Sequence, residues 1–225
     1  MGKISIKSVV MKTFCLLTLA LTSAYAQVTI SGPEYRLEKI GAAPAELGSS
    51  VHGLLAKEGH RVLTAAGKPA FEIWLRAEAP KGPPSGEEAV SINTVPQGAL
   101  MAVISFPSKW ADRRGQSVKP GLYTMRYSLF PVTGDHQGVA PQRDFFLLSP
   151  ANIDTEGKAL PNFADLVAMS LKATGTPHPG VFSIWKPEAA EFKAGFHKEG
   201  DHDWVFTQKI GDLPVSMILI GAADH

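Results

Sequence analysis

Hydrophobic and polar residues alternate along much of the chain with the period of a β-strand. In residues 122–130 one face carries the larger apolar side chains, Tyr123, Met125, Tyr127 and Leu129. The other face carries Thr124, Arg126 and Ser128, which is the pattern of a strand half buried in a sheet. Residues 145–148 are apolar on both faces and predict an interior strand. The loop between these strands, residues 132–143, is longer than a hairpin needs and is a candidate place for function.

Other segments repeat the strand pattern at short spacing. Residues 60–65 and 70–77 are separated by a turn in which Gly67 suits a position with positive φ. The remaining strands are predicted at residues 100–106, 181–185, 192–197, 204–210 and 215–220. Short connections between successive strands favour antiparallel pairing.

One segment has the period of a helix instead. One helical face is formed by Phe163, Leu166, Val167, Ser170 and Leu171. Asn162 is suited to begin this helix and Gly175 to end it, so it should span about residues 162–174. The whole pattern predicts a mainly β protein, an antiparallel β-sandwich with one accessory α-helix.

The first 26 residues have the layout of a secretory signal peptide. Three lysines precede a mainly apolar run, residues 14–21, and the segment ends in a small-x-small cleavage site at residues 24–26. The apolar run is too short to span a bilayer, and no later run reaches the necessary length of about 20 residues. We therefore expect a single domain at residues 27–225, exported to the periplasm or the cell exterior, with no membrane span after cleavage.

Composition narrows the chemistry of the mature chain. The only cysteine, Cys15, lies in the predicted signal peptide, which excludes disulfides, cysteine nucleophiles and thiolate metal sites after cleavage. Removing Lys3, Lys7 and Lys12 from 22 basic and 21 acidic residues leaves 19 against 21, a charge of about −2. A charge this close to neutral gives no basis for nucleic-acid binding.

Common enzyme signatures are absent from the sequence. It has no phosphate-binding loop, no dinucleotide-type glycine fingerprint, no Gly-x-Ser-x-Gly elbow and no His-Glu-x-x-His pair. Three histidines in turns, His136, His178 and His202, could bind zinc or copper if their loops meet. Their separations of 42 and 24 residues match no known ligand spacing. This favours the alternative that each histidine is an exposed turn residue or a cap.

The long loop offers a second candidate site. Arg143 could present its planar guanidinium to a carboxylate or phosphate of a ligand, with Asp135, His136 and Asp144 nearby. The alternative is an internal ion pair of Arg143 with Asp135 or Asp144. Four tryptophans, among them Trp110, could stack on a glycan. Each of them lies in or beside a predicted strand, which favours a core position for at least half of them.

Several short motifs are similar to a group of known proteins. They are Gly67-Lys68-Pro69 with residues 72–76, the Lys-Pro-Gly-Leu-Tyr-Thr run at residues 119–124, and the Gly-Asp-His-Gln-Gly run at residues 134–138. Together they resemble uncharacterised secreted bacterial β-sandwich proteins, a domain of unknown function, over about residues 67–150. The resemblance implies an exported sandwich and no activity, so it assigns no catalytic residue.

The sequence thus leads to three hypotheses of different kinds. The first is an exported soluble binding module for a small molecule, a glycan or a peptide. The second is a histidine-based metal-binding protein or a metal-dependent hydrolase with zinc or copper. The third is one part of a larger cell-surface assembly, which would require an exposed apolar patch.

Overall fold

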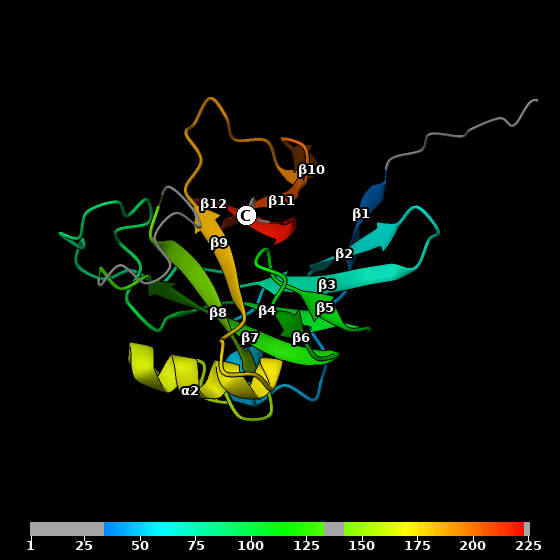
Figure 1. The fold of residues 1–225 in the computed structure, drawn as a ribbon. Coiled ribbons are helices and arrows are strands. Elements are labelled where there is room, and N and C mark those ends of the chain that lie inside the picture. The colour runs from blue at the N-terminus through cyan, green and yellow to red at the C-terminus, as the bar shows by residue number, and fades with distance from the viewer. Residues whose placement is uncertain (1–33, 133–141, 223–225) are drawn as a thin grey trace, which may run out of the picture. The chain divides into compact units, whose positions relative to one another are not determined.

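The computed structural model describes residues 34–132 and 142–222, which belong to the compact unit Gly32–His225. The predicted signal peptide lies outside the described residues. Within them the chain is mainly β, with ten antiparallel strands in one sheet, two further short strands and two helices (Figure 1). In chain order the elements are β1 (Tyr35–Ile40), α1 (Ser49–His52), β2 (Gly59–Thr64), β3 (Pro69–Leu75), β4 (Leu100–Phe106), β5 (Trp110–Ala111), β6 (Ser117–Val118), β7 (Gly121–Leu129), β8 (Asp144–Pro150), α2 (Phe163–Thr174), β9 (Val181–Trp185), β10 (Gly195–Glu199), β11 (Asp203–Ile210) and β12 (Leu213–Ile220).

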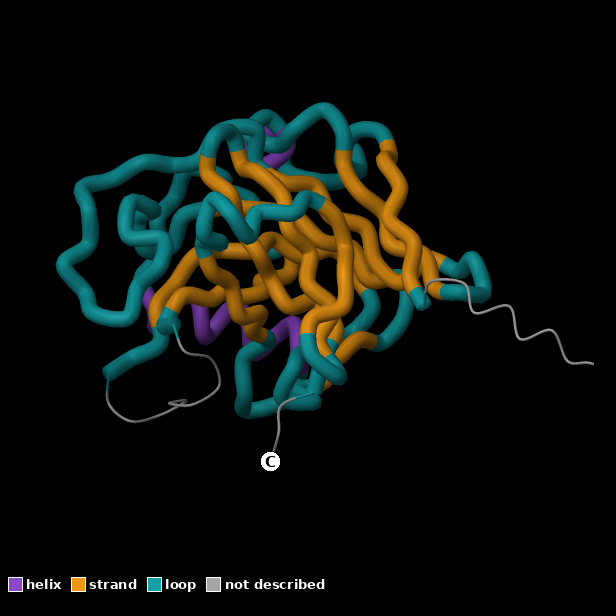
Figure 2. The backbone as a smooth tube through the Cα atoms, turned by 90° about the horizontal axis from the view of Figure 1, so that it is seen from above, coloured by secondary structure: helices purple, strands orange, loops and turns teal. Residues whose placement is uncertain are grey.

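The large sheet is continuous and nearly closed. Its strand order is β1-β2-β3-β4-β7-β8-β9-β12-β11-β10. Strand β9 joins the two halves, because residues 181–183 pair with β8 whereas residues 184–185 pair with β12. The sheet curls in a barrel-like way until its edge strands β1 and β10 lie side by side (Figures 1 and 2). The predicted pair of stacked sheets is therefore replaced by one sheet whose two ends face each other.

Aromatic side chains close the seam between the two edges of the sheet. Tyr35 on β1 packs edge to face on Trp204 of β11, with ring centroids 4.8 Å apart, and on Phe196 of β10 at 5.7 Å. Phe71 on β3 contacts the same Phe196 at 5.6 Å. Each aromatic pair contributes about 0.5–1.5 kcal/mol beyond its buried area. We call these four residues the aromatic seam.

Most of the predicted elements are confirmed. Strands β4 and β9 have the predicted bounds, and the turn between β2 and β3 has Gly67 at a φ of 74°. The side chain of Asn162 accepts a hydrogen bond from the backbone N–H of Asp165 at 3.0 Å and caps helix α2. Gly175 ends the helix in the left-handed conformation, with a φ of 69°. The accessory helix thus begins and ends where capping chemistry predicts.

Apolar side chains pack on both faces of the sheet. The interior of the curled sheet is filled by the largest cluster, which contains buried residues from both of its halves. On the outer face, α1 and its flanking residues cover β3 and β4, with Val51 and Leu55 packed against Trp74. Helix α2 covers β8, with Leu166 packed near Phe145 in a third cluster. The sheet is consequently buried on two sides along its central strands.

The polar face of β7 is also buried, although the alternation predicted a half-buried strand. Thr124, Arg126 and Ser128 have no exposed surface. Arg126 donates two hydrogen bonds to the carboxylate of Asp154, from Nε to Oδ2 at 2.5 Å and from Nη2 to Oδ1 at 2.7 Å. Thr124 donates to the same carboxylate. The segment after β8 therefore lies over this face of β7.

The remaining donors of Arg126 bind backbone carbonyls. They reach Gly98 at 2.7 Å and both Glu156 and Ala159 at 2.8 Å. A guanidinium has five N–H groups, so every donor of Arg126 has a partner. A buried ion pair is tolerated only when its hydrogen bonds are satisfied in this way.

Replacing Arg126 with methionine should lower the free energy of unfolding by about 3–5 kcal/mol, because the buried Asp154 would lose its cation. The matched control is Arg61→Met. Arg61 pairs with Glu72 at the surface, where their side chains are 36% and 23% exposed, and its loss should cost at most about 1 kcal/mol. Urea denaturation of both variants measures the two values. Equal losses would contradict this account of Arg126.

Candidate functional site

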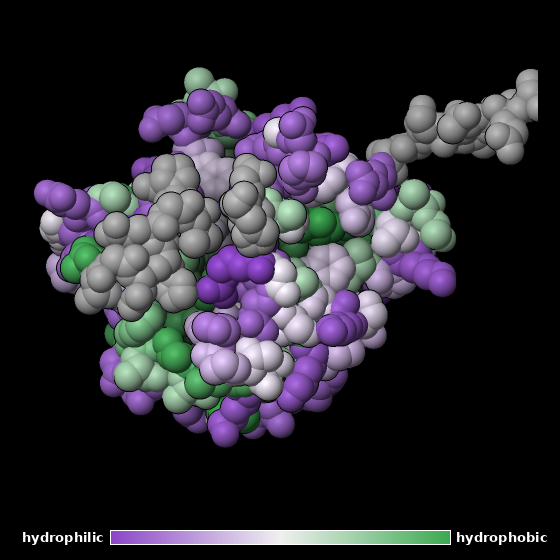
Figure 3. Space-filling model, viewed as in Figure 1, coloured by the Kyte–Doolittle hydropathy of each residue, from purple (hydrophilic) through white to green (hydrophobic). Residues whose placement is uncertain are grey.

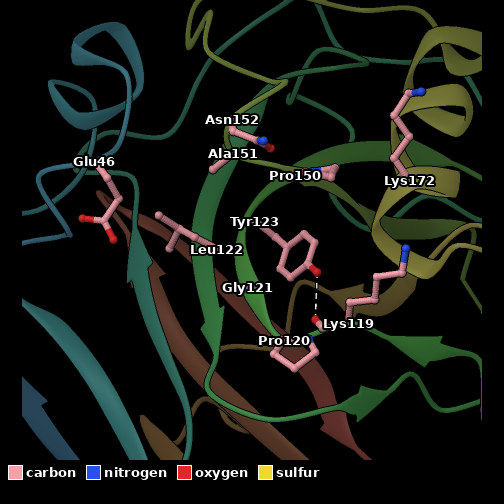
Figure 4. Close-up of a pocket in the computed structure, with 10 residues that line it drawn as sticks. All are labelled: Glu46, Lys119, Pro120, Gly121, Leu122, Tyr123, Pro150, Ala151, Asn152 and Lys172. Atoms are coloured by element: carbon pink, nitrogen blue, oxygen red, sulfur yellow. Dashed lines mark hydrogen bonds between the residues drawn. The ribbon is translucent and has the colours of Figure 1, made fainter.

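A cleft of about 390 Å³ lies at the end of the sheet where β7 begins and β8 ends, between the residues that precede α1 and the end of α2 (Figure 4). Its apolar lining comes from the start of β7 and the end of β8, and includes Leu122, Tyr123, Pro150 and Ala151. Sites for small molecules typically measure roughly 300–1,000 Å³ and combine an apolar lining with a few polar groups. The cleft has both properties.

The polar groups of the cleft come from separate parts of the chain. Glu46 lies on one side, Lys119 and Lys172 lie on the other, and Asn152 lies between them in the view of Figure 4. Glu46 precedes α1, Lys119 precedes β7, Asn152 follows β8, and Lys172 is in the last turn of α2. The fold thus places charges of opposite sign on facing walls.

The position of Lys119 is fixed by its backbone. Its N–H donates to the carbonyl of Ala173 in α2 at 3.2 Å, and its carbonyl accepts from the Tyr123 hydroxyl at 2.7 Å. Gly121 has a φ of 154°, a conformation that L side chains rarely adopt, so the turn between these two bonds requires glycine. The Lys119 side chain passes over the helix end, because a Cβ added to Gly175 would lie 2.7 Å from Nζ.

The two lysines bring positive charge that the described protein does not neutralise. Lys119 and Lys172 are exposed, and neither is among the ion pairs of the described residues. Both lie at the C-terminal end of α2, where the helix dipole stabilises a cation by about 0.3–1 kcal/mol. Burial raises the pKa of the neighbouring Tyr123 above its ordinary value, so the phenol stays neutral and adds no negative charge.

Arg143, a predicted ligand-binding residue, is held by its own protein. Its Nη1 donates to the carboxylate of Glu87 at 2.7 Å and its Nε donates to the carbonyl of Phe130 at 2.7 Å. Arg143 therefore forms an internal ion pair, but its partner among the described residues is Glu87, whereas the alternative named Asp135 or Asp144. Asp135 and His136, the other predicted members of this site, lie outside the described residues.

Asp144, another predicted ligand-binding residue, is fully buried. It accepts hydrogen bonds from the backbone N–H groups of Ser91 and Ile92 at 2.7 and 2.9 Å, and from the Tyr127 hydroxyl at 2.8 Å. Burial and the Asp144 charge raise the pKa of Tyr127 above its ordinary value. The carboxylate thus fastens the loop before β4 to the sheet.

Trp110, the last predicted ligand-binding residue, faces the core. It stacks on Phe106 with ring centroids 5.3 Å apart, and its Nε1 donates to the carbonyl of Leu219 at 3.1 Å. Trp74 is buried and Trp204 belongs to the aromatic seam. For these three rings, packing within the protein accounts for the position.

Two of the three predicted metal ligands lie on loops that contact the turn between β5 and β6. Beside His178, the carbonyl of Pro179 accepts from Arg114 at 2.8 Å. Beside His202, the carboxylate of Asp203 accepts from Arg113 at 3.0 Å. Two guanidinium groups thus adjoin the histidine loops, and each is paired with a carboxylate, Arg113 with Asp203 and Arg114 with Asp112.

The third predicted metal ligand, His136, lies outside the described residues. Within the described ranges, no group of three or more His, Cys, Asp or Glu side chains could hold a metal ion. The site formed by His136, His178 and His202 therefore stays a prediction.

Sequence reasoning did not select the charged residues of the cleft. Lys119 was noticed only as the first residue of the run at residues 119–124, Lys172 lies on the polar side of the predicted helix, and Glu46 lies in a stretch without a period. Lys119 and Lys172 line the same cleft because the backbone N–H of Lys119 donates to the carbonyl of Ala173. No local pattern in the sequence predicts that contact.

Exposed apolar side chains gather mainly near α2. In the view of Figure 3, hydrophobic side chains are visible at the lower left, over the position of α2 in Figure 1. The exposed large apolar residues of the described chain are Val132, Ile153, Leu160 and Phe163. Nothing in the described part of the chain identifies a partner for them, so the assembly hypothesis stays a prediction.

A Tyr127→Phe variant should respond differently to alkaline pH. In the unfolded chain Tyr127 ionises near about pH 10, whereas in the folded chain its pKa is raised. Its contribution to stability is full below about pH 10 and is lost as the pH rises from there toward the folded pKa. Urea denaturation between about pH 8 and pH 11 should show a steeper loss for the unmodified protein than for the variant. Parallel losses would show that Tyr127 ionises normally.

The histidine prediction has a direct test in metal content. If His136, His178 and His202 form a site, protein purified without a histidine tag should carry near-stoichiometric zinc or copper, and His136→Ala should lose it. Elemental analysis of both proteins gives the answer. Equal metal content in the two, or none in either, would rule out this site.

Two further observations concern the class of the protein. In the ranges that the structure describes, no helix has the length and apolar character needed to cross a membrane. No protein-family model, curated protein or solved structure matches the chain.

Proposed function

We propose that the protein is an exported binding module whose ligand is a small organic anion with an apolar part, held in the cleft between the residues that precede α1 and the end of α2. The observation that carries this proposal is the pair of lysines, Lys119 and Lys172, which have no counterion among the described residues and adjoin an apolar lining. A ligand carboxylate or phosphate would supply the missing negative charge.

The chemistry of the cleft suits such a ligand. Hydrogen bonds between an ammonium and a carboxylate are charge-assisted and about twice as strong as neutral ones. Leu122 and Pro150 offer apolar surface to the rest of the molecule, at roughly 25 cal/mol for each Å² removed from water. The two lysines select a ligand with negative charge, and the apolar lining selects one with an apolar part.

Export and the absence of catalysis rest on the sequence. The first 26 residues have a signal-peptide layout, and common catalytic motifs are missing. The resemblance of residues 67–150 to uncharacterised secreted bacterial proteins points the same way. A rigid sheet that carries a cleft at one end is a suitable frame for a binding module.

Binding should depend on both lysines. With benzoate, phenylacetate, hexanoate and phenyl phosphate as probes, we expect at least one to raise the melting temperature of the unmodified protein. The dissociation constant for that probe should rise about tenfold, ~1.4 kcal/mol, in Lys119→Gln and in Lys172→Gln. Calorimetric titration at low salt measures it, and added salt should weaken binding, since both lysines are exposed.

The matched control is Lys68→Gln. Lys68 is an exposed lysine in the turn between β2 and β3 and lies outside the cleft. Its replacement should leave the affinity unchanged. An equal effect of all three substitutions would indicate non-specific attraction to a positive surface, and no binding of any anion would contradict the proposed function.

A further inference from the structure

The side of the cleft formed by Glu46 carries negative charge. It restricts the ligand further than the two lysines do. Glu46 is exposed and, like the two lysines, belongs to none of the ion pairs among the described residues. The charges that line the cleft from opposite sides therefore do not neutralise one another.

This separation is a consequence of the fold. Glu46 belongs to the segment before α1. This segment and α1 pack on the outer face of β3 and β4 through Leu47 and Val51. Lys119 is fastened to the end of α2 through Ala173. The apolar residues at the start of β7 and the end of β8 lie between the two walls (Figure 4). A molecule that spans the cleft would meet a carboxylate at one end and two ammonium groups at the other.

We infer that the ligand is a linear zwitterion, a short peptide with free termini, whose terminal ammonium faces Glu46 and whose terminal carboxylate faces Lys119 and Lys172. The inference rests on the proposed function, because it takes the same cleft as the binding site. An anion without a cationic end would leave Glu46 uncompensated and would be repelled by it. A zwitterion places each of its charges beside a charge of opposite sign.

Groups between the charged walls suit the middle of a peptide. Asn152 carries an amide with donors and an acceptor, the complement of a peptide bond. The Tyr123 hydroxyl already donates to the carbonyl of Lys119, so toward a ligand it can act only as an acceptor, for example for a peptide N–H. Leu122 and Pro150 leave apolar surface for a side chain. Specificity for sequence should be weak, since the side chain meets only this surface.

Three matched dipeptides test the inference on the full protein. They are alanyl-leucine with free termini, its N-acetyl derivative without the positive charge, and its C-terminal amide without the negative charge. We expect free alanyl-leucine to bind about tenfold more tightly than either derivative, as measured by calorimetric titration. Lys68→Gln should keep this ranking and serves as the folded control.

Charge-removing variants assign each terminus to its wall. Glu46→Gln should weaken free alanyl-leucine about tenfold while leaving the N-acetyl derivative unchanged or tighter, because it removes only the partner of the ammonium. The double variant Lys119→Gln/Lys172→Gln should weaken the binding of the free and the acetylated peptide by the same factor. It should leave the affinity for the amide unchanged. Circular dichroism of each variant establishes that it is folded.

The outcomes separate the inference from the proposed function. If the N-acetyl derivative binds as tightly as the free peptide and Glu46→Gln changes nothing, the ligand is a simple anion, so the inference fails and the proposed function stands. If no peptide and no anion binds, or the lysine variants bind as the unmodified protein does, both fail.

Discussion

The ion pair of Arg126 and Asp154 is the contact on which the outer side of the molecule depends. Arg126 occupies the centre of β7, and its guanidinium binds backbone carbonyls before β4 and after β8 as well as its carboxylate partner. Asp154 lies only two residues beyond Asn152, which belongs to the cleft. The buried ion pair therefore lies next in the sequence to the part of the cleft between its charged walls. Hydrogen bonds to all five donors are what make this burial tolerable.

The nearly closed sheet depends on a different kind of contact. Its edge strands β1 and β10 are brought together by the rings of the aromatic seam. Backbone pairing is directional and fixes register, whereas ring contacts tolerate small displacements. The sheet thus combines a hydrogen-bonded ladder across nine pairings with one junction made by side chains. Edges covered by bulky rings are also less available for pairing with another chain.

Periodicity was sufficient to predict most of the strands and the long helix, but it could not predict their arrangement. Strand β9 is five residues long and looks like any buried strand, and nothing in its sequence shows that it divides its pairing between β8 and β12. Helix α1 was missed because residues 40–50 are small and lack a period. Arg126 was placed on the correct face of β7, yet its burial depends on the distant Asp154.

The candidate site was harder to predict than the fold, for a related reason. Its charged residues come from segments that lie far apart in the sequence, and each is ordinary in its local context: a lysine in a turn, a lysine on a helix, a glutamate in a coil. The residues that did look unusual, Arg143, Asp144 and Trp110, have partners inside the protein. The residues that looked unusual in the sequence form contacts within the protein. The cleft, in contrast, arises only when distant segments pack together.

The divided pairing of β9 also constrains the order in which the protein can be completed. Because β12 follows β9 in the chain, residues 184–185 have no partner until the last described strand is available for pairing. In that interval β9 presents a free edge and the interior lacks Met217 and Leu219. Incompletely folded chains with such edges are prone to associate with one another. Completion of the fold is therefore a late event that the final strand controls.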